Sequence, residues 1–237
     1  MPAPIGRRTL LGAGAAVVFG AVLTACGGND DDTSSAGGTI PLNGATVPEG
    51  RPAVDLTPAQ STAGRNVVMI GDSITVGSAP GLEAAAELLG VKLTIYAEEG
   101  RRITVGRNPA AGVEVIADVL DEGGVPDLFV IALGTNDIGK YASQDEYEAQ
   151  INQLLELVPD VTPVAWINTY VRDDPNDSAQ FNAALIATLE NRGNATIARW
   201  SNIASADGIL EDGIHPSDDG RAQFADLVGG EIENWLN

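Results

Sequence analysis

The chain contains only one cysteine, Cys26, among its 237 residues. Because no second thiol is present, the folded protein cannot form an intramolecular disulfide. Its stability must therefore come from the burial of apolar side chains, and a chain of this length can bury a core large enough for that.

Basic residues are also scarce. Thirteen Lys and Arg stand against thirty-three Asp and Glu. Without Arg7 and Arg8, which lie in a segment that we expect to be removed, eleven basic residues remain and the formal charge is about −22. Such a surface repels nucleic acid and anionic phospholipid headgroups, so the composition argues against a nucleic-acid partner and favours neutral or cationic ones.

Residues 1–26 have the pattern of an export signal. The paired arginines precede an apolar run over residues 10–25, which is too short for a membrane span and fits either a twin-arginine or a general secretory signal. The run ends in Leu23-Thr24-Ala25-Cys26, which resembles a lipobox, in which the cysteine becomes a lipidated N-terminus. We expect an exported protein whose membrane contact is a lipid on Cys26, on the outer face of the cytoplasmic membrane in the cell envelope. An ordinary buried thiol is the alternative for this residue.

Residues 27–64 predict a tether. The stretch 27–38 is rich in Gly, Ser and Asp and has no apolar periodicity, which is typical of a flexible linker. Prolines at positions 41, 48, 52 and 58 then favour an extended segment. The three aspartates at 30–32 are contiguous rather than spaced around a turn, so we expect a solvated segment and not a calcium site.

Residues 65–237 predict one domain of alternating strands and helices. Apolar runs indicate five strands, over residues 67–70, 92–97, 127–133, 163–169 and 195–200. Helical patterns follow over residues 81–89, 111–120, 145–157, 178–191 and 217–236. This alternation predicts a five-stranded parallel sheet with helices on both faces, a three-layer α/β/α sandwich of flavodoxin-like type.

The first strand is followed by Gly71-Asp72-Ser73. Ligands of open α/β sheets bind at the carboxyl ends of the strands. A serine at this turn, in front of a helix, lies where a nucleophile would lie, close to backbone N–H groups. The alternative is that Ser73 only caps the next helix.

Histidine is as rare as cysteine, since His215 is the only one in the chain. A serine nucleophile needs a base that titrates near neutral pH, and histidine is the usual one. Asp212 precedes it by three residues and could orient the imidazole, as the acid of a serine triad does. Gly213 and Pro216 indicate a loop, and a surface histidine without a catalytic role is the alternative.

Two further strand ends carry candidates for an oxyanion hole. Asn136, in Gly134-Thr135-Asn136-Asp137, could donate its side-chain amide to a developing oxyanion, although a simple turn would also explain this stretch. Gly100 follows the second strand and could bring a backbone N–H close to the same oxyanion.

These four stretches, in this order, resemble the four blocks of the SGNH (GDSL-type) hydrolase family, and the resemblance covers residue 66 to the C-terminus. It implies a flavodoxin-like sandwich and acyl-ester chemistry, for which we expect no cofactor and no metal. It also implies roles for single residues. Ser73 would be the nucleophile, His215 the base and Asp212 its partner, and the oxyanion hole would consist of the backbone N–H groups of Ser73 and Gly100 and the Asn136 side chain.

Within the family, residues 71–77, 100–101, 198–200 and 212–216 are similar to the extracytoplasmic SGNH domains of cell-envelope O-acetyltransferases. Those domains are usually fused to an integral-membrane acyltransferase, and nothing in this chain resembles that half. The sequence therefore predicts an exported, lipid-anchored serine esterase that cleaves short-chain acyl esters, with cell-envelope glycans as candidate substrates. Two alternatives stay open, an O-acyltransferase to an envelope glycan and a non-catalytic envelope-binding module.

Overall fold

The structure is a computed structural model, and it describes residues 64–237. The predicted signal, Cys26 and the predicted tether up to residue 63 lie outside the described residues, so the boundaries at 26 and 64 stay predictions. No helix within residues 64–237 is both long enough and apolar enough to cross a membrane.

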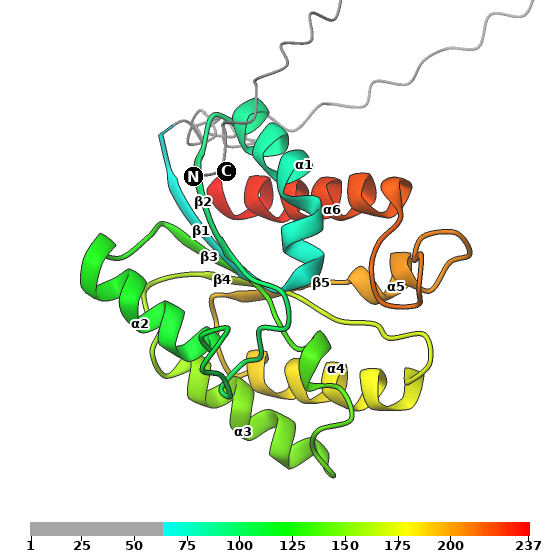
Figure 1. Ribbon diagram of the computed structural model, residues 1–237. Helices are drawn as coiled ribbons and strands as arrows, with labels where there is room; N and C mark the ends of the chain where they lie inside the picture. Colours follow the sequence, from blue (N-terminus) through cyan, green and yellow to red (C-terminus); the bar gives the residue numbers. More distant parts are fainter. Residues whose placement is uncertain (1–63) are drawn as a thin grey trace, which may run out of the picture. The chain divides into compact units, whose positions relative to one another are not determined.

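A five-stranded sheet forms the middle layer, and its strands run in the order β2-β1-β3-β4-β5 (Figure 1). All four neighbouring pairs are parallel. The strands are β1 (Asn66–Gly71), β2 (Lys92–Ala97), β3 (Leu128–Ala132), β4 (Val164–Ile167) and β5 (Ala195–Ala198). Every residue of the central strand β3 is buried, which is expected for a parallel strand covered on both faces. The predicted five-stranded parallel sheet is confirmed.

Helices cover both faces of this sheet (Figure 1). One face carries α1 (Ser73–Leu89), α5 (Trp200–Ala204) and α6 (Asp218–Leu236), whose buried residues belong to one apolar cluster. The other face carries α2 (Gly112–Gly123), α3 (Gln144–Leu155) and α4 (Pro175–Leu189), with a second cluster. The predicted three-layer α/β/α sandwich is therefore also confirmed.

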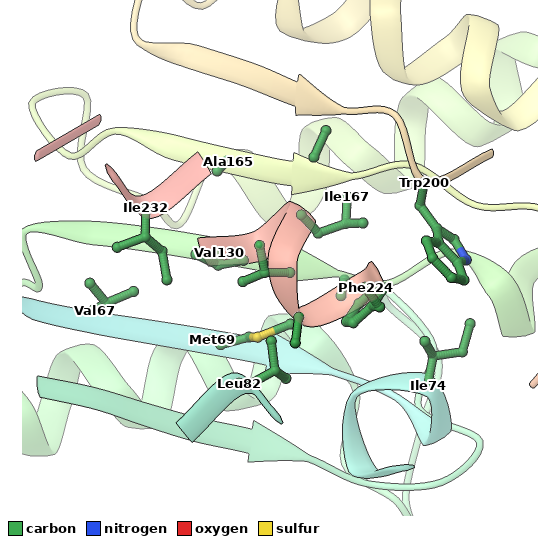
Figure 2. Close-up of a cluster of buried hydrophobic side chains, with 14 of the residues drawn as sticks. Val67, Met69, Ile74, Leu82, Val130, Ala165, Ile167, Trp200, Phe224 and Ile232 are labelled. Atoms are coloured by element: carbon green, nitrogen blue, oxygen red, sulfur yellow. The ribbon is translucent and has the colours of Figure 1, made fainter. Parts of the chain in front are cut away.

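Side chains at alternate positions of a strand enter opposite clusters, as the two-residue period of a strand requires. Val67 and Met69 of β1 pack with α1 and α6, whereas Ile70 packs with the helices of the other face. Figure 2 shows the first cluster, in which Leu82 of α1 and Phe224 of α6 lie against the sheet. Each fully buried side chain of this size contributes about 1.5–3 kcal/mol to folding.

The structure corrects two predicted elements. Helix α1 begins at Ser73 and not at residue 81. Ile74, Thr75 and Gly77 are weak helix formers, but the Asp72 side chain caps the first turn and Ile74 and Thr75 are buried there. The fifth strand ends at Ala198, because Trp200 begins the short helix α5, which the sequence pattern did not predict.

Candidate active site

The strand ends that carry the candidate residues lie side by side. Gly71, the last residue of β1, is in register with Ala97 at the end of β2 and with Ala132 at the end of β3. The turns that follow these strands therefore meet at one edge of the sheet. This register explains why Ser73, Gly100 and Asn136, which are far apart in the sequence, belong to one site.

The single histidine connects the candidate nucleophile to the candidate acid. His215 Nε2 lies 3.0 Å from Ser73 Oγ, although the two residues are 142 positions apart. His215 Nδ1 lies 2.7 Å from Asp212 Oδ2. The structure thus brings together the three sequence-predicted residues in the order of a serine triad, with His215 within hydrogen-bond distance of both Ser73 and Asp212.

The loop that carries Asp212 and His215 is fixed by its own backbone. Asp212 Oδ1 accepts from the backbone N–H groups of Ile214 at 3.0 Å and His215 at 2.8 Å. The His215 side chain and these two N–H groups hold the pKa of Asp212 well below its usual range. An ionised Asp212 keeps a proton on Nδ1 of the imidazole and leaves Nε2 free to take the serine proton.

Gly100 lies in the turn after β2. The backbone N–H of Arg101 donates to the carbonyl of Glu98 at 3.3 Å, and Gly100 has a φ of 77°, a conformation that residues with a Cβ rarely adopt. Within residues 64–237 the backbone N–H groups of Gly100 and Ser73 have no hydrogen-bond partner. Both candidate backbone donors of the oxyanion hole are thus available to a ligand.

Asn136 lies in η1 (Thr135–Asp137), the short 3₁₀ helix after β3. Its Nδ2 donates to the carbonyl oxygen of Arg101 at 3.1 Å and to Asp72 Oδ2 at 3.2 Å. The first partner follows Gly100 and the second precedes Ser73. Asn136 is therefore hydrogen-bonded to the residue after Gly100 and to the residue before Ser73.

Asp72 itself was not among the predicted site residues. It is 1% exposed, and this burial raises the pKa of its carboxyl group to about 7. The hydrogen bond from the backbone N–H of Ile74 acts in the opposite direction, as does the nearby charge of His215. The signal that could have identified Asp72 is its place between an apolar strand and the candidate nucleophile.

Two consecutive arginines after Gly100 were also missed. Arg101 is buried, and its guanidinium donates to the backbone carbonyls of Gly71, Tyr96 and Ala110.

The second arginine, Arg102, pairs through Nε with Asp137 Oδ1 at 2.9 Å. The other oxygen, Asp137 Oδ2, accepts from the Ile103 backbone N–H at 3.1 Å. Burial raises the pKa of Asp137 and lowers that of Arg101. The two arginines attach the segment after Gly100 to the ends of β1, β2 and β3.

A cleft of about 270 Å³ opens beside Ser73. Its walls come from the first turn of α1, the turn at Glu99, the loop that carries His215, and Arg221 of α6. A larger hollow of about 410 Å³ lies where α3 and α4 end, and none of the candidate catalytic residues lines it. Among the described residues no group of three or more His, Cys, Asp or Glu side chains could hold a metal ion.

The fold is a three-layer α/β/α sandwich that brings a serine, a histidine and an aspartate together at the carboxyl edge of its parallel sheet. The family model of the GDSL-like Lipase/Acylhydrolase family matches residues 69–223, and the chain belongs to this family. The family and the fold support an acyl hydrolase or acyltransferase activity. No curated protein matches the chain.

Three solved structures illustrate the likeness of the fold. TesA is 16% identical with a TM-score of 0.62, over 73% of this chain and 100% of that one. The C-terminal catalytic domain of peptidoglycan O-acetyltransferase A (OatA) of Streptococcus pneumoniae, with a methylsulfonyl adduct, is 18% identical with a TM-score of 0.58, over 73% of this chain and 95% of that one. An SGNH hydrolase from Slackia heliotrinireducens is 19% identical with a TM-score of 0.57, over 70% of this chain and 98% of that one. The predicted SGNH family with O-acetyltransferase relatives is confirmed.

Proposed function

We propose that the protein is a serine esterase that cleaves short-chain acyl esters. The observation that carries this proposal is the pair of contacts of His215, 3.0 Å to Ser73 Oγ and 2.7 Å to Asp212 Oδ2. A base held between a serine hydroxyl and an ionised carboxylate is the arrangement that turns the hydroxyl into a nucleophile.

In the first half of the cycle, Ser73 Oγ attacks the ester carbonyl carbon and its proton passes to His215 Nε2. The oxygen of the tetrahedral species accepts hydrogen bonds from the backbone N–H groups of Ser73 and Gly100 and from the Asn136 side chain. The bond to the leaving alcohol then breaks, His215 returns the proton to that alcohol, and the acyl group stays on Ser73 as an ester.

In the second half, a water molecule takes the place of the alcohol. His215 accepts a proton from the water as its oxygen attacks the acyl carbon, and the same three donors stabilise the second oxyanion. The carboxylic acid leaves when His215 returns the proton to Ser73 Oγ. Each turnover consumes one water and leaves the protein unchanged.

The size and lining of the cleft support a short acyl group. At about 270 Å³ it is small, and most of the side chains around it are charged or polar. The apolar side chains in its lining are those of Val76 and Pro216. Long acyl chains need an extended apolar pocket, and this cleft has none among its lining residues.

Transfer to a glycan hydroxyl is the second candidate, and the fold shared with an O-acetyltransferase catalytic domain favours it. In that reaction a sugar hydroxyl replaces water in the second half of the cycle and receives the acyl group.

We also propose that the protein acts in the cell envelope, anchored by a lipid on Cys26, because residues 1–26 have the pattern of a lipoprotein signal. A neutral glycan fits the acidic surface of the protein better than an anionic polymer does.

The test is acyl release from nitrophenyl esters of increasing chain length by the mature chain, with and without a sugar acceptor. We expect turnover that is highest for acetyl and falls with chain length, and a covalent acyl adduct on Ser73 by mass spectrometry. Ser73→Ala abolishes both. Ser78→Ala is the matched control, because Ser78 is a buried residue of the same helix whose hydroxyl has no hydrogen-bond partner within residues 64–237. A chain that is folded but inactive on every ester would support the non-catalytic module instead.

A further inference from the structure

Asp72 lies beside the site but takes no part in the cycle proposed above. Its Oδ1 accepts from the backbone N–H of Ile74 at 3.0 Å and so caps helix α1. A helix cap of this kind needs only one oxygen. The second oxygen, Oδ2, accepts from Asn136 Nδ2 at 3.2 Å, and this contact has no role in capping.

The Asn136 amide nitrogen has two hydrogens, and the structure gives each of them an acceptor. One acceptor is the carbonyl oxygen of Arg101 at 3.1 Å, and the other is Asp72 Oδ2. If the amide were turned over, Oδ1 would face the Arg101 carbonyl, which cannot donate. The two acceptors therefore fix which end of the Asn136 amide faces Asp72 and Arg101, the chain neighbours of Ser73 and Gly100.

We infer that Asp72 is a positioning residue for the oxyanion hole, which holds the Asn136 amide with its nitrogen toward the hole. The inference rests on the proposed function, because it assigns Asn136 as a donor to the oxyanion. At 3.2 Å the contact is longer than the 2.7–2.9 Å of a typical charge-assisted hydrogen bond, so it orients the N–H without binding it tightly. When charge develops on the substrate oxygen, that N–H turns to it, while the Arg101 carbonyl keeps the other.

The substitution Asp72→Asn separates this role from capping. Asparagine is as good an N-cap as aspartate, so its oxygen keeps the hydrogen bond from Ile74 and its amide nitrogen takes the place of Oδ2. That nitrogen then meets the nitrogen of Asn136, and two donors face each other. Asn136 can relieve this conflict only by turning its oxygen toward the hole, where it would repel the oxyanion.

The experiment is a double-mutant cycle on the mature chain at pH 8, with a short-chain nitrophenyl ester as substrate. We expect Asp72→Asn to lower kcat by about ten- to a hundredfold, somewhat less than the loss of a whole oxyanion donor, with KM changed by about twofold or less. In an Asn136→Ala background the same substitution should change kcat by about twofold or less, because the group through which it acts is gone. Asp127→Asn, at the opposite end of β3, is the matched control and should leave kcat unchanged.

The outcomes separate this inference from the proposed function. If Asn136→Ala lowers kcat but Asp72→Asn does not, Asp72 is only a helix cap and the inference is wrong. If Asp72→Asn lowers kcat by the same factor with and without Asn136, it acts through another group and the inference is also wrong. If Asn136→Ala leaves kcat unchanged, the oxyanion hole of the proposed function is wrong, whatever Asp72 does. Melting temperatures of all variants show whether a loss of rate reflects loss of fold.

Discussion

The guanidinium of Arg101 donates from Nη1 to the carbonyl oxygen of Gly71 at 3.1 Å. Gly71 ends the strand that precedes Ser73, and Arg101 follows Gly100, so this contact joins the turn of the proposed nucleophile to the turn of a proposed oxyanion donor. The same guanidinium also reaches the carbonyls of Tyr96 and Ala110. One buried side chain therefore links the turns that carry Ser73 and Gly100.

We predict that Arg101→Lys lowers both stability and turnover. Lysine keeps the charge, but its donors all lie on one nitrogen, so it cannot reach both the Ala110 carbonyl, which Nε contacts, and the Gly71 and Tyr96 carbonyls, which Nη1 contacts. A buried carbonyl that loses its last donor costs about 1–3 kcal/mol, whereas the Gly71 carbonyl keeps the backbone N–H of Glu98 at 3.3 Å. Thermal unfolding and kcat on a short-chain ester measure the two effects, and Arg107→Lys, at an exposed position of the same segment, is the control. An unchanged melting temperature would show that the three contacts do not support the site.

The raised pKa of Asp72 makes the stability of the protein depend on pH. Burial raises the pKa of Asp72 to about 7 from 3.8, so the folded protein holds this proton more tightly than the unfolded chain does. Stability is therefore lost as the pH rises from about 4 to about 7. The charges that face Asp72 are those of His215, Asp137 and Arg101, and they are present in wild type and variant alike.

Asp72→Asn removes this titration. The melting temperature of the variant, relative to that of wild type, should therefore rise between pH 4 and pH 8, while its turnover falls. Unfolding scans of both proteins across this range measure the difference. A difference that does not change with pH would mean that Asp72 has the same pKa in the folded and unfolded chains.

The cleft predicts selectivity for the charge of the ester. Arg221 is the arginine that lines the cleft, and its guanidinium already pairs with Asp218 at 2.8 Å and with Glu211 at 3.4 Å. Glu99, which also lines the cleft, is exposed and forms no ion pair within the described part of the chain. The cleft therefore has surplus negative charge and should disfavour esters of anionic alcohols.

We expect Glu99→Gln to raise kcat/KM for an anionic acetyl ester by about two- to fivefold at low salt and to leave a neutral ester unchanged. The gain should shrink as salt is added, because exposed charges are screened. Glu122→Gln, at an exposed position of α2, is the matched control. Equal gains on the neutral and the anionic ester would rule out an electrostatic cause.

The proposed lipid anchor can be tested by substituting Cys26, which lies outside the described residues. If Cys26 ends a lipobox, Cys26→Ala should release the protein from the membrane fraction or leave its precursor uncut. Several acyl chains on one cysteine hold a protein firmly, whereas a single chain gives only marginal binding. Fractionation and the mass of the mature protein measure this, and unchanged values for both would contradict the assignment.

The sequence was sufficient for the sheet, because buried parallel strands are nearly continuous apolar runs. It also indicated Ser73, Asp212 and His215 as candidates that the structure brings together, since the chain has a single histidine and an acid stands three residues before it. The distances from His215 to Ser73 and Asp212 depend on the fold and could not be predicted from the spacing of these residues in the sequence. The first turns of α1 were missed because propensity is local, while the Asp72 cap and the burial of Ile74 depend on tertiary structure.

The supporting residues were missed for a related reason. An arginine in a protein of this charge is expected at the surface, and nothing in the sequence shows that Arg101 is buried against three carbonyls. Asp72 likewise looks like a helix cap, and only the structure shows its second oxygen on Asn136. Contacts between residues far apart in the sequence have no local pattern that could predict them.

The measurement that tests the central claim most directly is turnover by His215→Ala, because the chain has no second histidine to replace this base. We expect a folded variant whose kcat is lower by several orders of magnitude, about as low as that of Ser73→Ala, with the double variant scarcely worse than either, since members of one catalytic unit are not additive. Substantial esterase activity in a folded His215→Ala protein would contradict the mechanism and the function proposed from it.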